Sequence, residues 1–366
     1  LVTLSGGANI YAGGDYMQKA MFPHDFSIQG KGTTGEQMDQ VLTEFVNEQQ
    51  LPVTKKGVYP YYTMGVTSRA GNQLDINAAA QKFVTPKTYI LAVSEADYQN
   101  MTGKTLNLGD DEVALYQQGV KLDSKQDLQL AGQTFKIKEE LKEDFIFGHL
   151  PDQMNMIVPE KIYMVLKNPD QIFSAMTDKY AVNLNYYGWL DTKLSTEEQR
   201  NLRDAYQEKL QQFNQTLPEN QAVYGSVTAF DKQEIKGMLG GMFFIGIFLS
   251  IVFMLGTILI IYYKQISEGY EDRYRFVILQ KVGLDEKQIR QTIRKQILIV
   301  FFLPLAFAFI HLTFAYHMLS LILSALGVLN SALMLAVTLG VCAIFFISYV
   351  IVFMITSRSY RTIVSM

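Results

Sequence analysis

The sequence has little cysteine, little histidine and little charge. Cys342 is the one cysteine among 366 residues, which excludes a disulfide framework and a zinc site built from cysteines. None of the four histidines lies at a metal-ligand spacing from the cysteine or a carboxylate. Only 18% of the residues are charged, against about 25% in an average soluble protein. The composition therefore argues against a disulfide-rich secreted protein and against a metalloenzyme.

Phosphate-binding loops are missing as well. Residues 4–7 (LSGG) match four letters of an ATPase signature loop, but the chain offers no phosphate-cradling loop to accompany them. Residues 103–105 (GKT) match the end of a P-loop, yet Tyr98 stands where that loop requires glycine. We therefore expect no catalytic residue, no bound cofactor and no metal in this chain.

Long stretches without any charged residue are present. Residues 237–263 form one such stretch of 27 residues, which as a helix spans about 40 Å and exceeds a hydrocarbon core of about 30 Å. Residues 296–357 form a second, 62 residues long, which suits two crossings joined by a turn within 319–330. These lengths exceed those of buried helices in soluble proteins. Transmembrane helices are thus predicted near 238–262, 297–319 and 331–355.

The distribution of charge predicts an orientation. Residues 1–236 carry 22 basic and 30 acidic residues, whereas residues 237–366 carry 10 and 5. Eight basic residues lie in the loop 264–295 and two more in the tail 357–366, whereas none lies in 320–330. The positive-inside rule places the loop and the tail in the cytoplasm and residues 1–236 outside the cell.

The outer part reads as a mixed α+β domain over residues 14–236. Two capping boxes, Thr34 with Gln37 and Ser195 with Glu198, predict helix starts. Residues 88–93 and 162–166 read as strands, and each precedes a helical stretch. Residues 1–13 are expected to be the outer end of a preceding span. The predicted fold is therefore an α-helical transmembrane bundle, with three full spans, plus a large extracellular α+β domain.

The cytoplasmic loop 264–295 is too long and too patterned for a simple connection. Its apolar residues share one helical stripe with basic residues around it, and a glycine suits the end of a first helix before a second one. Such a pair of coupling helices either lies on anionic lipid or docks to a cytoplasmic protein. The expected docking residues are Tyr270, Arg273, Tyr274, Arg275, Phe276, Ile278, Lys281 and Gly283.

Four residues within the spans are candidates for helix packing. Gly237 and Gly241 form a small-xxx-small pair that permits close approach of a second helix. Pro304 removes a backbone hydrogen bond and predicts a kink. His311 is an ionisable group inside a span, for which helix–helix hydrogen bonding is favoured over a proton-relay role.

The run ISEGYEDRYRFVILQKVGLDEKQIRQTIRKQILIVFFLPLAFAFIHLTFA resembles FtsX-like permeases, the membrane subunits of type VII (MacB-like) ABC transporters. Residues 273–283 occupy the place of that family's coupling element. The phrases PKTYILAVSEADYQNMTGK and LQLAGQTFKIK in the outer domain look like the same group. The closest subgroup is the ten-span permeases of Gram-positive bacitracin and antimicrobial-peptide resistance, of which these residues would form the C-terminal part.

The resemblance implies mechanotransmission in a bacterial plasma membrane. A separate dimeric ABC ATPase would bind ATP and magnesium in the cytoplasm, and its movement would pass through the coupling helices to the outer domain. The partners implied are that ATPase, a sensor kinase and a cationic peptide or lipid-linked ligand, with no nucleic acid. An alternative is a non-transporting regulator that activates a cell-wall hydrolase or signals to the kinase.

Overall fold

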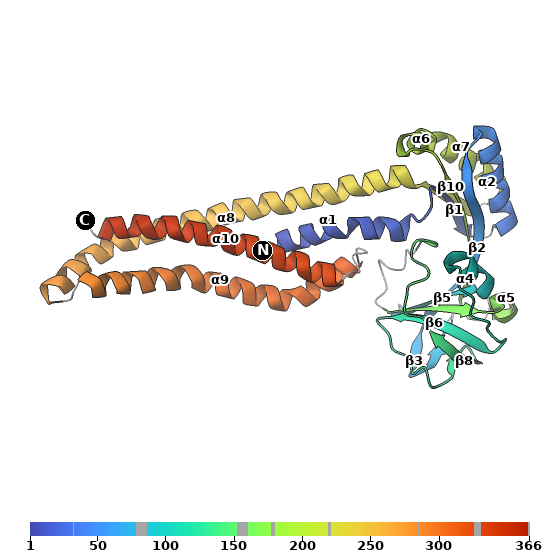
Figure 1. The fold of residues 1–366 in the computed structure, drawn as a ribbon, viewed down its shortest axis with the longest axis horizontal. Helices are drawn as coiled ribbons and strands as arrows, with labels where there is room; N and C mark the ends of the chain where they lie inside the picture. Colours follow the sequence, from blue (N-terminus) through green and yellow to red (C-terminus); the bar gives the residue numbers. More distant parts are fainter. Residues whose placement is uncertain are drawn as a thin grey trace. The chain divides into compact units, whose positions relative to one another are not determined.

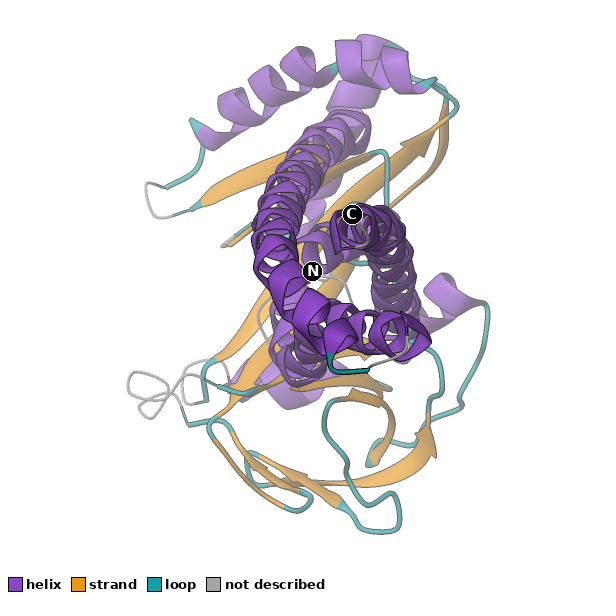
Figure 2. Ribbon diagram, turned by 90° about the vertical axis from the view of Figure 1, so that its left-hand side faces the viewer, coloured by secondary structure: helices purple, strands orange, loops and turns teal. Residues whose placement is uncertain are grey.

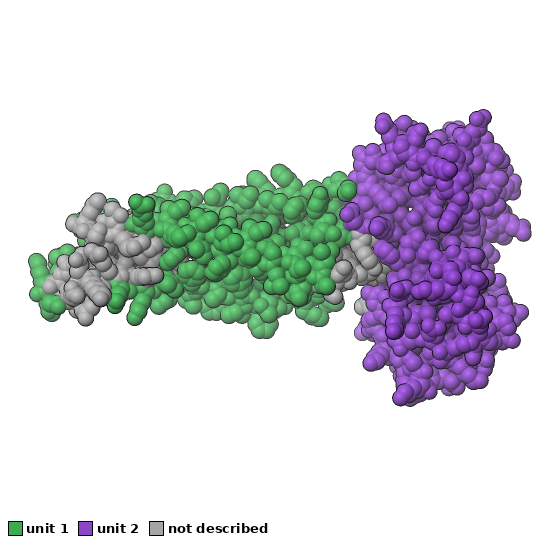
Figure 3. All heavy atoms as spheres, viewed as in Figure 1, with its two compact units in different colours: residues 1–14, 236–366 green, residues 15–235 purple. Residues whose placement is uncertain are grey.

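The computed structural model describes residues 1–31, 33–77, 86–151, 160–176, 180–218, 221–283, 286–325 and 331–364. The chain divides into two compact units, coloured separately in Figure 3. We call Asp15–Ile235 the head, and Leu1–Gly14 together with Lys236–Met366 the helical unit.

The head is built on one sheet, to which eleven strands belong among the described residues, in the order β11-β1-β10-β2-β5-β9-β6-β8-β7-β4-β3. Figures 1 and 2 show these strands with short helices beside them. The strands are β1 (Phe26–Lys31), β2 (Val53–Val66), β3 (Ser68–Ala70), β4 (Gln73–Asp75), β5 (Thr88–Ser94), β6 (Glu112–Gln118), β7 (Leu128–Leu130), β8 (Gln133–Glu140), β9 (Glu160–Leu166), β10 (Val182–Thr192) and β11 (Ala222–Val227).

The centre of the sheet explains why two of its strands read as continuous apolar runs. β5 and β9 pair in parallel, with Ile90 opposite Ile162 and Val93 opposite Val165. Ile90 and Ile162 enter one buried cluster, whereas Val93 and Val165 enter another on the opposite face. Because side chains alternate along a strand, a strand covered on both faces needs apolar residues at every position.

The helices of the head begin where capping residues stand. The capping boxes of Thr34 and Ser195 are both formed, and Ser94 caps the helix that follows β5. The stretch after Ser195 is broken at Leu202 into two helices, whereas one was expected. The helices are α2 (Gly35–Gln49), α4 (Glu95–Thr102), α5 (Pro169–Phe173), α6 (Thr196–Asn201) and α7 (Arg203–Asn214), with a 3₁₀ turn at Ser174–Met176.

A third buried cluster packs α2 and α7 on strands β1, β10 and β11. The packing is very close at Gly225 of β11, where a Cβ would lie 2.5 Å from Leu210 Cδ1 and 2.6 Å from the carbonyl oxygen of Ser27. Tyr206 fills the space beside it and donates its hydroxyl to that same carbonyl at 2.8 Å. The edge strand therefore has no room for a side chain at position 225.

Replacing Gly225 with alanine is expected to destabilise the head by about 2–3 kcal/mol, because backbone atoms must shift to relieve the overlap. Trp189 is the single tryptophan of the chain and is buried in the head, so its fluorescence during denaturant unfolding reports head stability. The matched control is Tyr224→Ala, which removes a side chain that is 59% exposed on the same strand and should change stability by less than about 1 kcal/mol. Equal losses in the two variants would contradict the overlap.

The helical unit contains long helices, three of which are long and apolar enough to cross a membrane. They belong to α8 (Thr228–Lys281), α9 (Glu286–Ala325) and α10 (Ser331–Val364), and the candidate spans within them are Thr228–Arg275, Leu298–Leu323 and Ala332–Thr356. The three spans predicted from sequence are therefore present, together with the sheet-rich α+β head. The expected turn at 319–330 starts too early, because α9 continues to Ala325 through residues that favour helix; residues 326–330 lie outside the described residues.

The first helix is longer than expected. Residues 1–13 were expected to end a span, but α1 runs from Val2 to Met21 without interruption. Its alanines, methionines and other helix-compatible residues sustain the helix past the glycine pair at 13–14. The helix therefore belongs in part to the helical unit and in part to the head.

Candidate coupling surface and head pocket

The first predicted coupling helix is not a separate element. α8 is one helix of 54 residues that includes both the uncharged stretch 237–263 and the residues up to Lys281. Gly269 lies between the two parts, but no proline or capping signal accompanies it, so the hydrogen-bond ladder of the span continues into the basic region. The prediction of a distinct helix after position 264 is thus wrong on this point, and the predicted coupling residues up to Lys281 lie in the last turns of the helix that contains the span.

The apolar residues at the end of α8 form an exposed stripe. Tyr270 and Tyr274 are 61% and 74% exposed, and Ile278 is 45% exposed one turn further on. Arg273, Arg275 and Lys281 are exposed beside them. The backbone of Phe276 is helical, but its side chain lies outside the described part. We call this surface, residues 270–281 of α8, the coupling surface.

A glycine ends the helix at the expected position. Gly283 has a φ of +104°, a conformation that side-chain-bearing residues rarely adopt. The N–H of Val282 donates to the carbonyl of Ile278 at 3.1 Å and closes the last turn. Because α9 starts at Glu286, only a short connection joins the two helices, as the sequence predicted; residues 284–285, including the predicted cap Asp285, are outside the described part.

The four predicted packing residues are not brought together in this chain. A Cβ at Gly237 or Gly241 would meet no described atom within 4 Å. Pro304 and His311 are both exposed on α9, which remains helical through the proline. Packing at these positions stays a prediction, and it requires a helix other than those described here.

Other small residues allow close packing between two helices, α1 and α8. Gly7 of α1 lies against the backbone of α8, since a Cβ there would be 3.4 Å from Phe243 Cα. On the facing helix, a Cβ at Gly246 would lie 3.2 Å from the carbonyl oxygen of Thr3. Tyr11 stacks on Phe243 with ring centroids 5.2 Å apart. The glycines of the LSGG stretch therefore serve helix packing, a role that sequence spacing alone did not reveal.

A buried polar cluster joins α1 to α10. The hydroxyls of Ser5 and Thr338 lie 2.9 Å apart, and Asn9 Nδ2 donates to Thr338 Oγ1 at 3.0 Å. All three side chains are buried. Polar side chains between apolar helices are stabilising when they bond one another, so this cluster fixes the register of α1 against α10.

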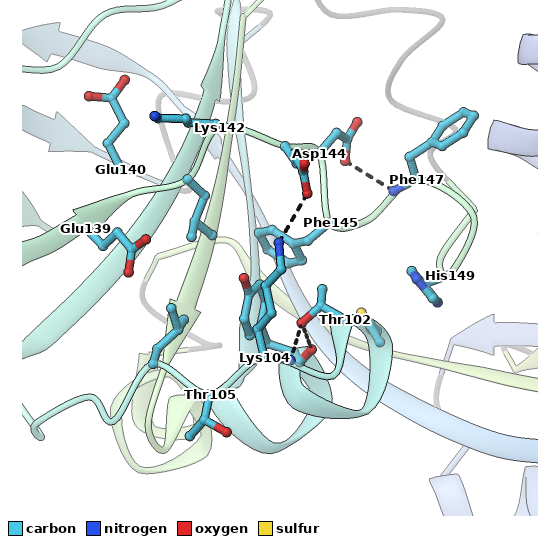
Figure 4. Close-up of a pocket in the computed structure, with 15 residues that line it drawn as sticks. Thr102, Lys104, Thr105, Glu139, Glu140, Lys142, Asp144, Phe145, Phe147 and His149 are labelled. Atoms are coloured by element: carbon cyan, nitrogen blue, oxygen red, sulfur yellow. Dashed lines mark hydrogen bonds and ion pairs between the residues drawn. The ribbon is translucent and has the colours of Figure 1, made fainter.

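The head contains a pocket of about 850 Å³ (Figure 4). α4 and the segment 139–149 line it, and the buried rings of Tyr98 and Phe145 form part of its wall, with their centroids 5.2 Å apart. Charged side chains stand around it: Lys104, Lys142, Glu139, Glu140, Glu143 and Asp144. Four carboxylates against two ammonium groups give the pocket a negative balance.

Hydrogen bonds lower the pKa of one group at this pocket, and burial lowers that of another. Donation from Gln117 and Ser124 lowers the pKa of the Glu140 carboxyl, so Glu140 stays negative near neutral pH. Burial, with a smaller contribution from the charge of His24, lowers the pKa of His149. Lys104 pairs with Glu143 at 3.3 Å across the pocket. The pocket thus offers an aromatic wall beside an anionic rim, a combination that suits an amphipathic cation.

Among the residues that the structure describes, no group of three or more His, Cys, Asp or Glu side chains could hold a metal ion. The absence of a cofactor in this chain stays a prediction.

No family model matches the sequence. Two curated proteins of Bacillus subtilis are similar to it: the ABC transporter permease YxdM, 33% identical over 117 residues, and the ABC transporter permease YvcS, 30% identical over 129 residues. The matched residues are 32% and 35% of this chain. The similarity supports an ABC permease family. The aligned part spans only 18% and 19% of the length of these relatives.

One solved structure, of a lipoprotein from Bacillus anthracis, aligns with 55% of this chain and 96% of its own. The alignment has 6% sequence identity and a TM-score of 0.25, which is too low to support a shared fold.

Proposed function

We propose that this chain acts as part of the permease subunit of an ABC transporter in a bacterial plasma membrane, with the head outside the cell. A separate cytoplasmic ABC ATPase dimer binds and hydrolyses ATP with magnesium, so that this chain transmits the motion and catalyses nothing itself. The ABC permease relatives support the transporter assignment, and the basic residues around the coupling surface support its cytoplasmic side.

The continuity of α8 is the single observation that carries this proposal. The helix starts at Thr228, directly after the last strand of the head, and ends at Lys281 beside the glycine turn. At 1.5 Å per residue its 54 residues extend about 81 Å, which is far more than a hydrocarbon core of about 30 Å. One uninterrupted helix therefore links the coupling surface to the last strand of the head, and we expect it to pass on a movement imposed at the coupling surface.

The ligand we assign to the head is a cationic, amphipathic peptide, as expected for antimicrobial-peptide export or resistance. The anionic rim and aromatic wall of the pocket support it, together with the excess of acidic residues in the head. Electrostatic attraction accelerates the encounter, and burial of apolar side chains on Tyr98 and Phe145 retains the peptide.

A charge-reversal variant tests this assignment. Glu139→Lys with Glu143→Lys is expected to weaken binding of a fluorescein-labelled lysine- and leucine-rich amphipathic peptide at least tenfold, measured by fluorescence anisotropy on the whole chain in detergent micelles. The matched control, Glu197→Lys with Glu208→Lys, changes net charge equally at exposed positions of α6 and α7, and its affinity should fall less than threefold. Equal weakening in both pairs would show non-specific attraction and would contradict a role for the pocket.

A further inference from the structure

A second pocket of the head, with a volume of about 620 Å³, lies along strands β3, β4, β7 and β8. These strands come last in the order of the sheet, and Figure 1 shows β3 and β8 at the opposite end of the head from α2 and α7. Gln73, Gln129, Gln133, Thr134 and Tyr180 are among the residues that line it. We call this pocket the polar groove.

The register of the strands places three polar side chains in a row. Gln73 of β4 lies opposite Gln129 of β7, and Gln129 lies opposite Thr134 of β8. Residues directly opposite each other on neighbouring strands share one face of the sheet, at a separation of about 5 Å. The alternate residues Leu74 and Leu130 are buried in the core on the other face. The exposed face therefore carries two amides and a hydroxyl at regular spacing.

The amides of the groove are not used to hold the head together. Among the residues that the structure describes, the side-chain amides of Gln73, Gln129 and Gln133 have no hydrogen-bond partner. Elsewhere in the head a glutamine such as Gln207 donates to a main-chain carbonyl of the sheet. Each primary amide supplies two N–H donors and one carbonyl acceptor, so the groove presents several donors and acceptors to a ligand.

Two tight turns hold the groove in shape. Between β7 and β8, Ala131 and Gly132 have φ values of +52° and +83°, the pair of positive values that a two-residue hairpin turn requires. Between β3 and β4, the side chain of Asn72 is buried and donates to the carbonyls of Asp123 and Gln126 at 2.8 and 3.0 Å. A site held by such turns loses little conformational freedom when a ligand binds.

The chemistry of the polar groove differs from that of the pocket beside α4. Its lining contains two charged residues, Arg69 and Asp75, whose opposite charges balance. A neutral ligand is therefore favoured over a peptide or lipid that carries net charge. Hydroxyl groups both donate and accept hydrogen bonds, as the amides and Thr134 do, and the C–H face of a sugar ring suits an aromatic wall such as Tyr180.

An extended peptide fits the groove less well than a sugar. Strand addition needs a free sheet edge of useful length, whereas β3, the last strand in the order, has three residues. Peptide side chains also need apolar pockets, but the aliphatic lining consists of Leu74, which is 2% exposed, and the small residues Ala70 and Ala131. Polar contacts therefore dominate what the groove offers.

We propose that the polar groove binds a neutral glycan, with the amides of Gln73 and Gln129 and the hydroxyl of Thr134 bonded to sugar hydroxyl or acetamido groups. The ring of Tyr180 covers part of one sugar. Binding itself does not depend on the proposed transport function. The source of the glycan does, because only a head outside the cell meets the polysaccharide of the cell wall.

Titration with chitotetraose, a neutral oligosaccharide of N-acetylglucosamine, tests the proposal. The whole chain is used in lauryldimethylamine oxide, a detergent without a sugar headgroup, and binding is followed by isothermal calorimetry. Gln73→Ala with Gln129→Ala is expected to weaken binding at least fivefold, the effect of losing hydrogen bonds to an uncharged ligand from two side chains. The matched control is Gln49→Ala with Gln211→Ala, at exposed positions of α2 and α7, which should leave the affinity within twofold.

Thr134→Val is a second variant, which removes one hydroxyl and keeps the shape of the side chain, and it should weaken binding about threefold. Unchanged unfolding of the head, followed by Trp189 fluorescence, shows that a variant is folded. No saturable binding of chitotetraose to the unmodified chain, equal weakening in the two glutamine pairs, or preference for a neutral serine- and glycine-rich peptide would overturn the proposal. The charge-reversal variant at Glu139 and Glu143 should bind chitotetraose normally, so this result is separate from that of the cationic peptide.

Discussion

Replacing Tyr270 and Tyr274 together with alanine is expected, on the proposed function, to reduce ATP-dependent activity of the assembled transporter more than tenfold. The two rings lie four residues apart on α8, are 61% and 74% exposed, and therefore project from one face of the helix. Exposed aromatic anchors of this kind supply a large share of the energy of protein interfaces. The measurement is peptide-stimulated ATP hydrolysis in membranes that contain the permease and its partner ATPase.

Tyr263→Ala is the matched control for that variant. Tyr263 is equally exposed at 66% and lies on the same helix, but it belongs to the uncharged stretch predicted to face lipid. Its replacement should leave hydrolysis within twofold of the unmodified protein. Normal stimulation in the double variant would defeat the coupling surface as a docking site, and the alternative of a segment lying on anionic lipid would then be favoured.

Replacing Gly246 with leucine is expected to separate α1 from α8 and to abolish the folded arrangement of the helical unit. A Cβ at this position already lies 3.2 Å from the Thr3 carbonyl oxygen and 3.9 Å from Gly7 Cα, so a larger side chain forces the two backbones apart. Association of helices within a bilayer depends on such close packing, because lipid supplies little hydrophobic drive. The expected result is a fall in thermal stability in detergent of more than 10 °C, roughly the effect of several kcal/mol.

The comparison variant is Gly241→Leu, five positions earlier on the same helix. No described atom lies within 4 Å of a Cβ at Gly241, so the substitution should change the melting temperature of this chain by less than about 2 °C. A large effect at position 241 together with a small one at position 246 would reverse the assignment and would restore the packing role predicted from the sequence.

Features that depend on local chemistry could be predicted from the sequence. The three spans follow from the absence of charge over tens of residues, since the cost of placing a charged side chain in a bilayer decides their position. Thr34 and Ser195 indicate helix starts because their hydroxyls meet unpaired N–H groups of the first turn. Gly283 marks a turn because its positive φ suits glycine.

Features that depend on which element faces which could not be predicted in the same way. The spacing of Gly237 and Gly241 is compatible with close packing, but spacing does not say whether a partner helix lies there. The contact between Gly7 and Gly246 joins residues far apart in the chain and has no periodic signal. The continuity of α8 was missed for another reason: the change from lipid-facing to water-facing residues was treated as a structural break, although nothing in the backbone requires one.

The sequence also could not predict the pocket or the contacts that His24 makes with Asp191 and the His149 carbonyl. Tyr98 and Phe145 come from separate segments that meet only because β5, β9 and β6 are neighbours in the sheet. His24, Asp191 and His149 are spread over more than 160 residues. Titratable residues at such separations carry no common spacing, so the order of the strands has to be known before their proximity can be recognised.

The length of α8 has a mechanical consequence. A stiff rod turns a small rotation into a large displacement, and a tilt of about 5° moves the far end of a helix about 81 Å long by roughly 7 Å. That distance is comparable to the separation between neighbouring packed helices. Under the proposed function, a partner that acts on the coupling surface therefore needs only a slight swing to displace the other end of α8, and leverage sets the size of that displacement.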